Sequence, residues 1–193
     1  MIVTIHQPEH FPYMGFFQKI SIADIFVVLD NVNYRKNYFQ NRNKIRSSSG
    51  EDIWLTVPVE KKATSKNIKD VVTSKDNKWR KKIIRTIYQE FKLDMTEIYS
   101  HEKLIDINMS SIRWALEKLN LNPKIVFASE LNARGSKSEL LADLCKKVKA
   151  TRYVSGPSGK NYLNLSFFKD IKVDFFQPKV KNNYSCLYNI NKI

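Results

Sequence analysis

Polar side chains follow two apolar segments near the amino terminus. Residues 2–5 are predicted to form a short strand, and His6 and Gln7 come directly after it. Residues 25–29 form a continuous apolar run, typical of a strand buried on both faces, and Asp30 follows it. Ligands of α/β proteins bind at the carboxyl ends of parallel strands. We therefore expect these three polar side chains to converge in one cleft.

The chemistry of this group suits proton transfer. The His6 imidazole can act as a general base or acid, the Gln7 amide can hold a substrate, and the Asp30 carboxylate can orient the imidazole. In a structural alternative, His6 bonds to the backbone and Asp30 caps a turn, and residue types alone favour that alternative. The nearby His10 is expected at the surface.

Residues 31–49 are polar and aromatic, and they contain a second group of candidate binding residues. Tyr34 lies upstream of Asn41 and Arg42 in this segment. Arginine and asparagine beside aromatic rings suit recognition of a phosphate, a carboxylate or a sugar. The same combination suits single-stranded nucleic acid, whose bases stack on aromatic side chains. The sequence leaves both open.

The segment 155–160 is a third candidate, with the sequence Ser-Gly-Pro-Ser-Gly-Lys. Its glycines and the hydroxyls of Ser155 and Ser158 allow backbone N–H groups to approach an anion, with Lys160 as a point charge. The GxxxxGK[ST] spacing of a phosphate-binding P-loop is not matched. A plain turn between a strand and a helix is the equal alternative.

The order of predicted elements indicates the fold class. Strand, helix and buried strand over residues 2–29 form the pattern of a βαβ crossover with parallel strands. Further helices are predicted at 79–91, 109–119 and 137–148, and further strands at 54–59, 125–127, 153–154 and 173–176. The sequence therefore predicts a single α/β domain over residues 1–178, with a mainly parallel sheet flanked by helices. Residues 179–193 are predicted to be a partly ordered tail.

The chain is strongly basic, with 33 Lys and Arg against 19 Asp and Glu and a net charge of +14. This excess favours an anionic partner: nucleic acid, an anionic membrane surface or a phosphate-bearing small molecule. The abundance of Lys, Asn and Ile is also the bias that low-GC genomes produce without selection on function. Charge alone therefore does not decide the function.

Other classes are disfavoured by what the sequence lacks. No apolar run approaches the roughly 20 residues that a membrane helix needs, and the amino terminus does not resemble an export signal. The two cysteines, Cys145 and Cys186, show no CxxC spacing, and HExxH does not occur. These observations predict a cytoplasmic protein without a membrane span, and no metal is expected.

A series of spaced residues resembles the WbqC-like protein family. The segments that carry the resemblance are His6-Gln7-Pro8, Phe11-Pro12, Gly15-Phe16-Phe17, Lys19-Ile20, Ala23-Asp24, residues 26–30, Asn41-Arg42-Asn43, residues 155–160 and Tyr162-Leu163. The resemblance covers roughly residues 2–178. The amino-terminal matches are specific, and the middle of the chain is generic.

Members of that family are commonly encoded among bacterial surface-polysaccharide and O-antigen genes, and sometimes near acyl-carrier proteins. The resemblance implies a transferase that moves an acyl or aminoacyl group to an amino sugar or sugar nucleotide in lipopolysaccharide biosynthesis. It also implies an acyl-carrier thioester as donor and an acidic acyl-carrier protein as partner. The matched polar positions are His6, Gln7, Asp30, Asn41, Arg42, Ser155, Ser158 and Lys160.

Two departures from known patterns matter. Family members usually continue with a His-Pro segment and a Ser-Asp carboxyl end, whereas this chain reads Phe176-Gln177-Pro178-Lys179. If those family residues take part in catalysis, this chain is either impaired or a natural short variant. The amino-terminal elements are also similar, more weakly, to nucleotidyltransferases with an HxGH motif, but Tyr13-Met14-Gly15-Phe16 has neither histidine.

Three functions follow from these observations. The first is the sugar-modifying transferase, with His6 and Asp30 as catalytic residues and Gln7, Tyr34, Asn41, Arg42, Ser155, Ser158 and Lys160 as binding residues. The alternatives are a basic nucleic-acid-binding module and a non-catalytic partner of an acyl-carrier protein. A steep fall of affinity with salt would identify the nucleic-acid module.

Overall fold

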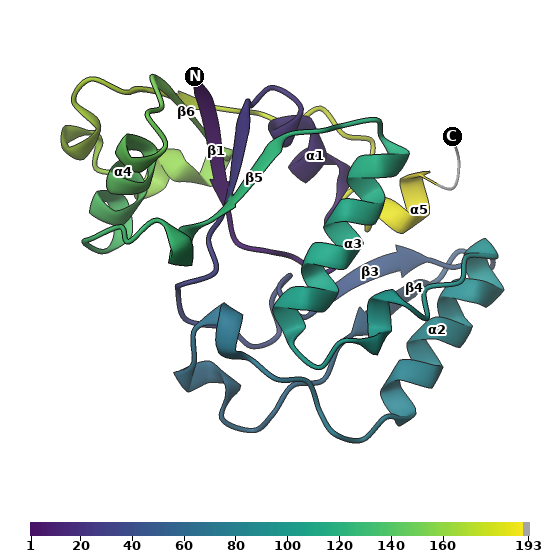
Figure 1. The fold of residues 1–193 in the computed structure, drawn as a ribbon. Helices are drawn as coiled ribbons and strands as arrows, with labels where there is room; N and C mark the ends of the chain where they lie inside the picture. Colours follow the sequence, from purple (N-terminus) through teal and green to yellow (C-terminus); the bar gives the residue numbers. More distant parts are fainter. Residues whose placement is uncertain (191–193) are drawn as a thin grey trace. The chain divides into compact units, whose positions relative to one another are not determined.

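The computed structural model describes residues 1–190, and it divides into two compact units (Figure 1). The sheet unit consists of Met1–Gln7, Gly15–Asp30 and Asn122–Lys181. Among the described residues, the hairpin unit consists of Pro8–Met14, Asn31–Leu121 and residues 182–190. Residues 191–193 of the predicted tail lie outside the described residues.

The sheet unit is built on five strands in the order β5-β2-β1-β6-β7, with every neighbouring pair parallel. The strands are β1 (Ile2–His6), β2 (Ile25–Val28), β5 (Lys124–Phe127), β6 (Arg152–Ser155) and β7 (Lys172–Phe175). This confirms the predicted α/β class with a parallel sheet. All five carboxyl ends lie at one edge, which we call the carboxyl edge.

Helices cover both faces of this sheet (Figure 1). Val3 and Ile5 of β1 pack into an apolar cluster with residues of α4 (Lys137–Lys147), whereas Phe26 of β2 contacts Phe16 of α1 (Met14–Ile20). Because successive side chains of a strand point to opposite faces, α1 and α4 lie on opposite sides. Ser136 precedes α4 as its N-cap, but its side chain makes no capping hydrogen bond.

The order in which the chain adds strands to the sheet reverses between the neighbouring strands β1 and β6. Strands β2 and β5 lie on one side of β1, and β6 and β7 lie on the other. After β1 the sheet unit continues with α1 on one face. After β6 it continues through a segment whose Phe168 packs into the cluster on the other face. In α/β proteins, ligands bind outside the carboxyl ends of the strands that flank such a reversal.

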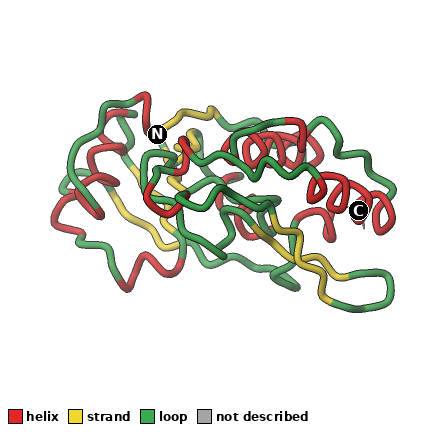
Figure 2. The backbone as a smooth tube through the Cα atoms, turned by 90° about the horizontal axis from the view of Figure 1, so that it is seen from below, coloured by secondary structure: helices red, strands yellow, loops and turns green. Residues whose placement is uncertain are grey.

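The hairpin unit contains an antiparallel strand pair and three helices (Figure 2). These are β3 (Arg42–Arg46), β4 (Asp52–Thr56), α2 (Lys78–Phe91), α3 (Leu104–Lys118) and α5 (Cys186–Ile190). Short 3-10 helices are η1 (Ala63–Ser65), η2 (Ile68–Asp70), η3 (Ile98–Ser100), η4 (Ala128–Glu130), η5 (Pro157–Asn161) and η6 (Leu165–Phe168), of which the last three belong to the sheet unit. Ile45, Leu55 and Ile87 are fully or almost fully buried.

Strand β3 lies in a segment that was predicted only to be polar and aromatic. Asn43 and Ile45 face the interior, while Arg42, Lys44 and Arg46 face outward. Ile45 is the one apolar residue of β3, so the alternation of apolar and polar residues that predicts a strand was too short to recognise in the sequence. The neighbouring strand predicted at 54–59 ends at Thr56, before Pro58, which cannot donate a ladder hydrogen bond.

Candidate functional site

His6 lies at the last position of β1, at the carboxyl edge and beside the reversal point. Its Nδ1 is 2.9 Å from the main-chain oxygen of Gln7. Because a carbonyl oxygen only accepts, Nδ1 carries the hydrogen and the lone pair is on Nε2. The ring also packs edge-on against Phe16, with centroids 4.9 Å apart. The main chain of Gln7 therefore fixes the tautomer of the imidazole.

The electrostatic environment keeps this imidazole neutral. Burial and, second, the positive charge of Lys19 lower the pKa of His6 to about 3, against a weaker opposing effect of the Gln7 carbonyl. Lys19 is itself buried in α1. Near neutral pH the ring is therefore uncharged, with Nε2 as its acceptor nitrogen.

Asp30 follows β2, the parallel neighbour of β1, and is buried. Its two carboxylate oxygens accept hydrogen bonds from the backbone N–H and the hydroxyl of Ser129, at 2.9 and 2.6 Å. Ser129 lies in η4, just beyond the end of β5, so the carboxylate links the segments that follow β2 and β5. Asp30 was predicted to orient the imidazole; in the structure the Gln7 carbonyl accepts the hydrogen bond from Nδ1 of His6. Any catalytic role of Asp30 stays a prediction.

The predicted anion loop begins at Ser155, the last residue of β6. β6 is attached to β1 through the Thr4 hydroxyl, which donates to the Val154 carbonyl at 2.9 Å. Ser155 is buried, and a Cβ at Gly159 would meet its Oγ at 2.2 Å, so a larger residue at position 159 would force the Ser155 side chain to shift. Ser158 and Lys160 are exposed, and Lys160 Nζ lies 5.9 Å from the ring centre of Phe175.

The remaining predicted binding residues belong to the hairpin unit. Tyr34 is buried, and burial raises the pKa of its hydroxyl to about 12, against the lowering influence of Arg42. Asn41 is buried and donates from Nδ2 to the Val57 carbonyl at 3.1 Å. The Arg42 guanidinium stacks over Trp54, 4.6 Å from the ring centre. Their binding roles stay predictions.

His10 corrects an expectation, because it is completely buried rather than at the surface. Its Nε2 lies 2.9 Å from the hydroxyl of Tyr99, and burial lowers the pKa of the imidazole to about 3. The segment around it is held in the hairpin unit: His10 N donates to the Phe39 carbonyl, and Asn108 donates to the Pro8 carbonyl. These contacts give His10 a structural setting.

Sequence reasoning missed Ser129, Tyr99 and Asn108. Asn108 left a signal, because it is a polar residue in the apolar face of α3, where a side chain must find partners. Ser129 and Tyr99 left none, since their partners are far away in the sequence. Within residues 1–190, no three His, Cys, Asp or Glu side chains are grouped to hold a metal ion.

Comparison with known proteins identifies the family. The model of the WbqC-like protein family matches residues 7–190. This chain belongs to the WbqC-like family. The match includes Gln7, Asp30 and the segment 155–160, and it starts one residue after His6. His6 itself lies outside the matched residues.

The WbqC-like chain is also similar to a protein of Mycobacterium tuberculosis that carries the name Uncharacterized protein Rv1507c. The two are 28% identical over 201 residues, covering 96% of this chain and 86% of the relative. No solved structure matches this chain. The family match reaches residue 190, so it includes most of the segment predicted to be a tail. The predicted boundary at residue 178 stays a prediction.

The described part of the chain offers no candidate for a bilayer span: none of its helices combines the necessary length with the necessary apolar character.

Proposed function

We propose that this WbqC-like protein is a transferase that moves an acyl or aminoacyl group from a carrier thioester to the amine of an amino sugar or sugar nucleotide. The observation that carries the proposal is the position of His6. Its imidazole lies at the reversal point of the parallel sheet, neutral, with the lone pair on Nε2. Membership of the family supports the same assignment.

In the proposed reaction the amine nitrogen attacks the thioester carbonyl. The C–N bond forms, the C–S bond breaks, and the proton released by the amine passes to Nε2 of His6. The thiolate then takes that proton and leaves as a thiol, so the imidazole returns to its neutral state. General base catalysis of this kind contributes about 10²–10⁴-fold to the rate.

The low pKa of His6 shapes this step. An imidazole with a pKa of about 3 is unprotonated near neutral pH and is a weak base, so it holds a transferred proton only briefly. The departing thiolate is a far stronger base, because an unperturbed thiol has a pKa of about 8.5. The proton therefore moves on to sulfur within the same turnover. The Gln7 carbonyl holds the ring in position throughout.

The other polar residues of the carboxyl edge would bind substrate. Lys160 is exposed beyond the end of β6 and would attract a phosphate of the carrier arm or of a sugar nucleotide. Ser158 would add a hydroxyl donor, and the Gln7 amide would contact a sugar hydroxyl. Because Lys160 is exposed, salt screens its contribution, so its effect falls as ionic strength rises.

The test compares His6→Ala with His101→Ala, a matched control at the third histidine, which bonds to Ser110. Thiol release from acyl- and aminoacyl-carrier thioesters is measured with a panel of amino sugars and their nucleotides. His6→Ala should slow turnover about 10²–10⁴-fold while leaving ligand-induced melting shifts nearly intact. Wild-type turnover in His6→Ala would refute the role. Complex formation with carrier protein but no product with any acceptor would support a non-catalytic partner instead.

A further inference from the structure

The outer side of the β3–β4 hairpin carries an unusual set of side chains. Three cations alternate along β3, namely Arg42, Lys44 and Arg46, and all three face outward because Asn43 and Ile45 face the interior. Lys44 pairs with Trp54 across the ladder. We call Arg42, Lys44, Arg46 and Trp54 the hairpin face.

Trp54 is the most informative residue of this face. It is 48% exposed, which is unusual for a side chain that is normally buried. The Arg42 guanidinium covers one side of it, 4.6 Å from the ring centre, and such stacking holds the indole in a fixed orientation. An exposed, braced indole next to cations is suited to stack a planar ring that carries negative charge.

The charge of the hairpin face is strongly unbalanced. Asp52 is its acidic neighbour, and it already accepts hydrogen bonds from Lys44 and from the hydroxyl of Tyr184. Tyr184 also lies 5.2 Å below the Lys44 ammonium, measured to the ring centre. Asp52 lies opposite Arg46 in the ladder and also interacts with its charge, but this one carboxylate meets three cations, so the hairpin face keeps a net positive charge and attracts anions.

We propose that the hairpin face binds single-stranded nucleic acid, with a base stacked on Trp54 and successive phosphates on the three cations. Alternate residues of a strand are about 6.7 Å apart, a spacing similar to that of neighbouring phosphates in an extended single strand. Stacking platforms flanked by cations are the usual way in which proteins bind single strands without sequence preference. This inference is independent of the transferase proposal.

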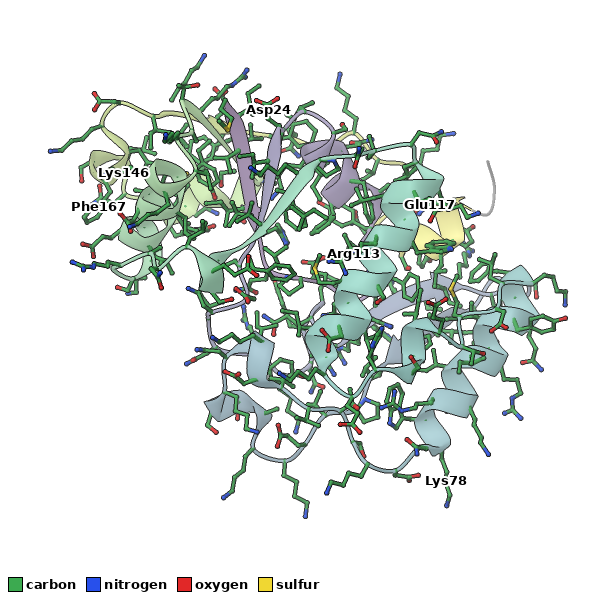
Figure 3. The ribbon with its side chains drawn as sticks, in the orientation of Figure 1. Asp24, Lys78, Arg113, Glu117, Lys146 and Phe167 are labelled. Atoms are coloured by element: carbon green, nitrogen blue, oxygen red, sulfur yellow. The ribbon has the colours of Figure 1, made fainter. Side chains whose placement is uncertain are left out.

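Helix α2 provides an internal comparison. Its exposed residues include Lys78, Lys81, Lys82 and Arg85, and Lys78 projects from its first turn (Figure 3). This surface is as cationic as the hairpin face, but it has no exposed indole, since Trp79 is buried. A general attraction of polyanions would use both surfaces. Base stacking would use the hairpin face alone.

The experiment measures binding of the full chain to fluorescein-labelled oligo(dT) and oligo(U) of about 12 nucleotides, by anisotropy, between 50 and 200 mM salt. Trp54→Ala should weaken binding about tenfold, and Trp54→Phe, which keeps a stacking ring, less. Arg46→Gln should flatten the plot of log affinity against log salt by about 0.7, the share of one phosphate contact. Oligonucleotide should also quench the tryptophan emission of the wild type but not of Trp54→Phe.

Lys81→Gln on α2 is the matched control, and heparin is the competitor without bases. Lys81→Gln should leave both the quenching and the Trp54-dependent affinity unchanged. The proposal is overturned if Trp54→Ala binds like the wild type, or if Lys81→Gln and Arg46→Gln weaken binding equally. It is also overturned if heparin binding depends on Trp54 as strongly as oligonucleotide binding does. None of these outcomes requires a transferase substrate, so they leave the proposed reaction untouched.

Discussion

The two units each hold a histidine whose pKa is about 3, and the two histidines differ in exposure and in position within the fold. In both cases burial is the main cause of the low pKa. His6 lies half-buried at the end of a strand, at the reversal point of a parallel sheet. His10 is fully enclosed and bonded to Tyr99. The same lowered pKa therefore occurs in two different settings, and only the setting of His6 is the strand end where ligands of α/β proteins bind.

The largest expected effect on stability would come from removing the enclosed imidazole. His10→Ala should lower the free energy of unfolding by about 3 kcal/mol, because it leaves a cavity and deprives the buried Tyr99 hydroxyl of its partner. His6→Ala should cost about 1 kcal/mol, since its ring is half-buried. Urea denaturation of both variants measures the difference. Equal losses would contradict the division into a structural and an accessible histidine.

Asp30 tests whether the carboxyl edge depends on its link to Ser129. Asp30→Ala should lower the free energy of unfolding by about 2 kcal/mol, because two hydrogen bonds to a buried carboxylate disappear and the β5 end loses its anchor. Ser129→Ala removes only the hydroxyl bond and should cost about 1 kcal/mol. Guanidinium denaturation of the two single variants and the double variant checks this. Additive losses would show that the two residues do not act together.

The low pKa of His10 also predicts how stability changes with pH. His10 has a pKa near 6.5 in the unfolded state and about 3 in the folded state. Between these two pH values the unfolded state binds a proton that the folded state does not bind. The contribution to stability is complete above pH 6.5 and is lost as the pH falls toward 3. At pH 5 the loss should be about 2 kcal/mol. Urea denaturation midpoints are measured at pH 7.5 and 5 for the wild type and for His10→Gln. The difference between the two proteins gives the part of the pH-dependent loss of stability that comes from His10.

The smallest expected effect concerns Lys19. Its charge is the second cause of the lowered pKa of His6, after burial. Lys19→Met keeps the length of the side chain and removes the charge, so the pKa of His6 should rise above about 3 and stay below 6.5. Titration of the histidine ring signals by NMR measures the pKa directly. A fall, or no change, would show that burial alone sets the value.

The sequence predicted the sheet unit better than the hairpin unit, for physical reasons. Residues 2–29 encode a strand, a helix and a buried strand through local apolar patterns, and these place His6 and Asp30 at one edge. The partners of polar residues are not local: Asp30 meets Ser129 across 99 positions and His10 meets Tyr99 across 89. A local pattern predicts where a side chain emerges, but tertiary packing decides what it meets.

The most direct test of the central claim is chemical rescue of His6→Gly by free imidazole. We expect acyl transfer from a carrier thioester to fall about 10²–10⁴-fold in this variant, and imidazole to restore a measurable part of the rate at pH 7.5. Free imidazole should not restore any activity that His10→Gly loses, because the His10 side chain is fully enclosed. A His6→Gly protein with wild-type turnover, or a loss that imidazole leaves unchanged, would contradict the role of His6 as proton acceptor.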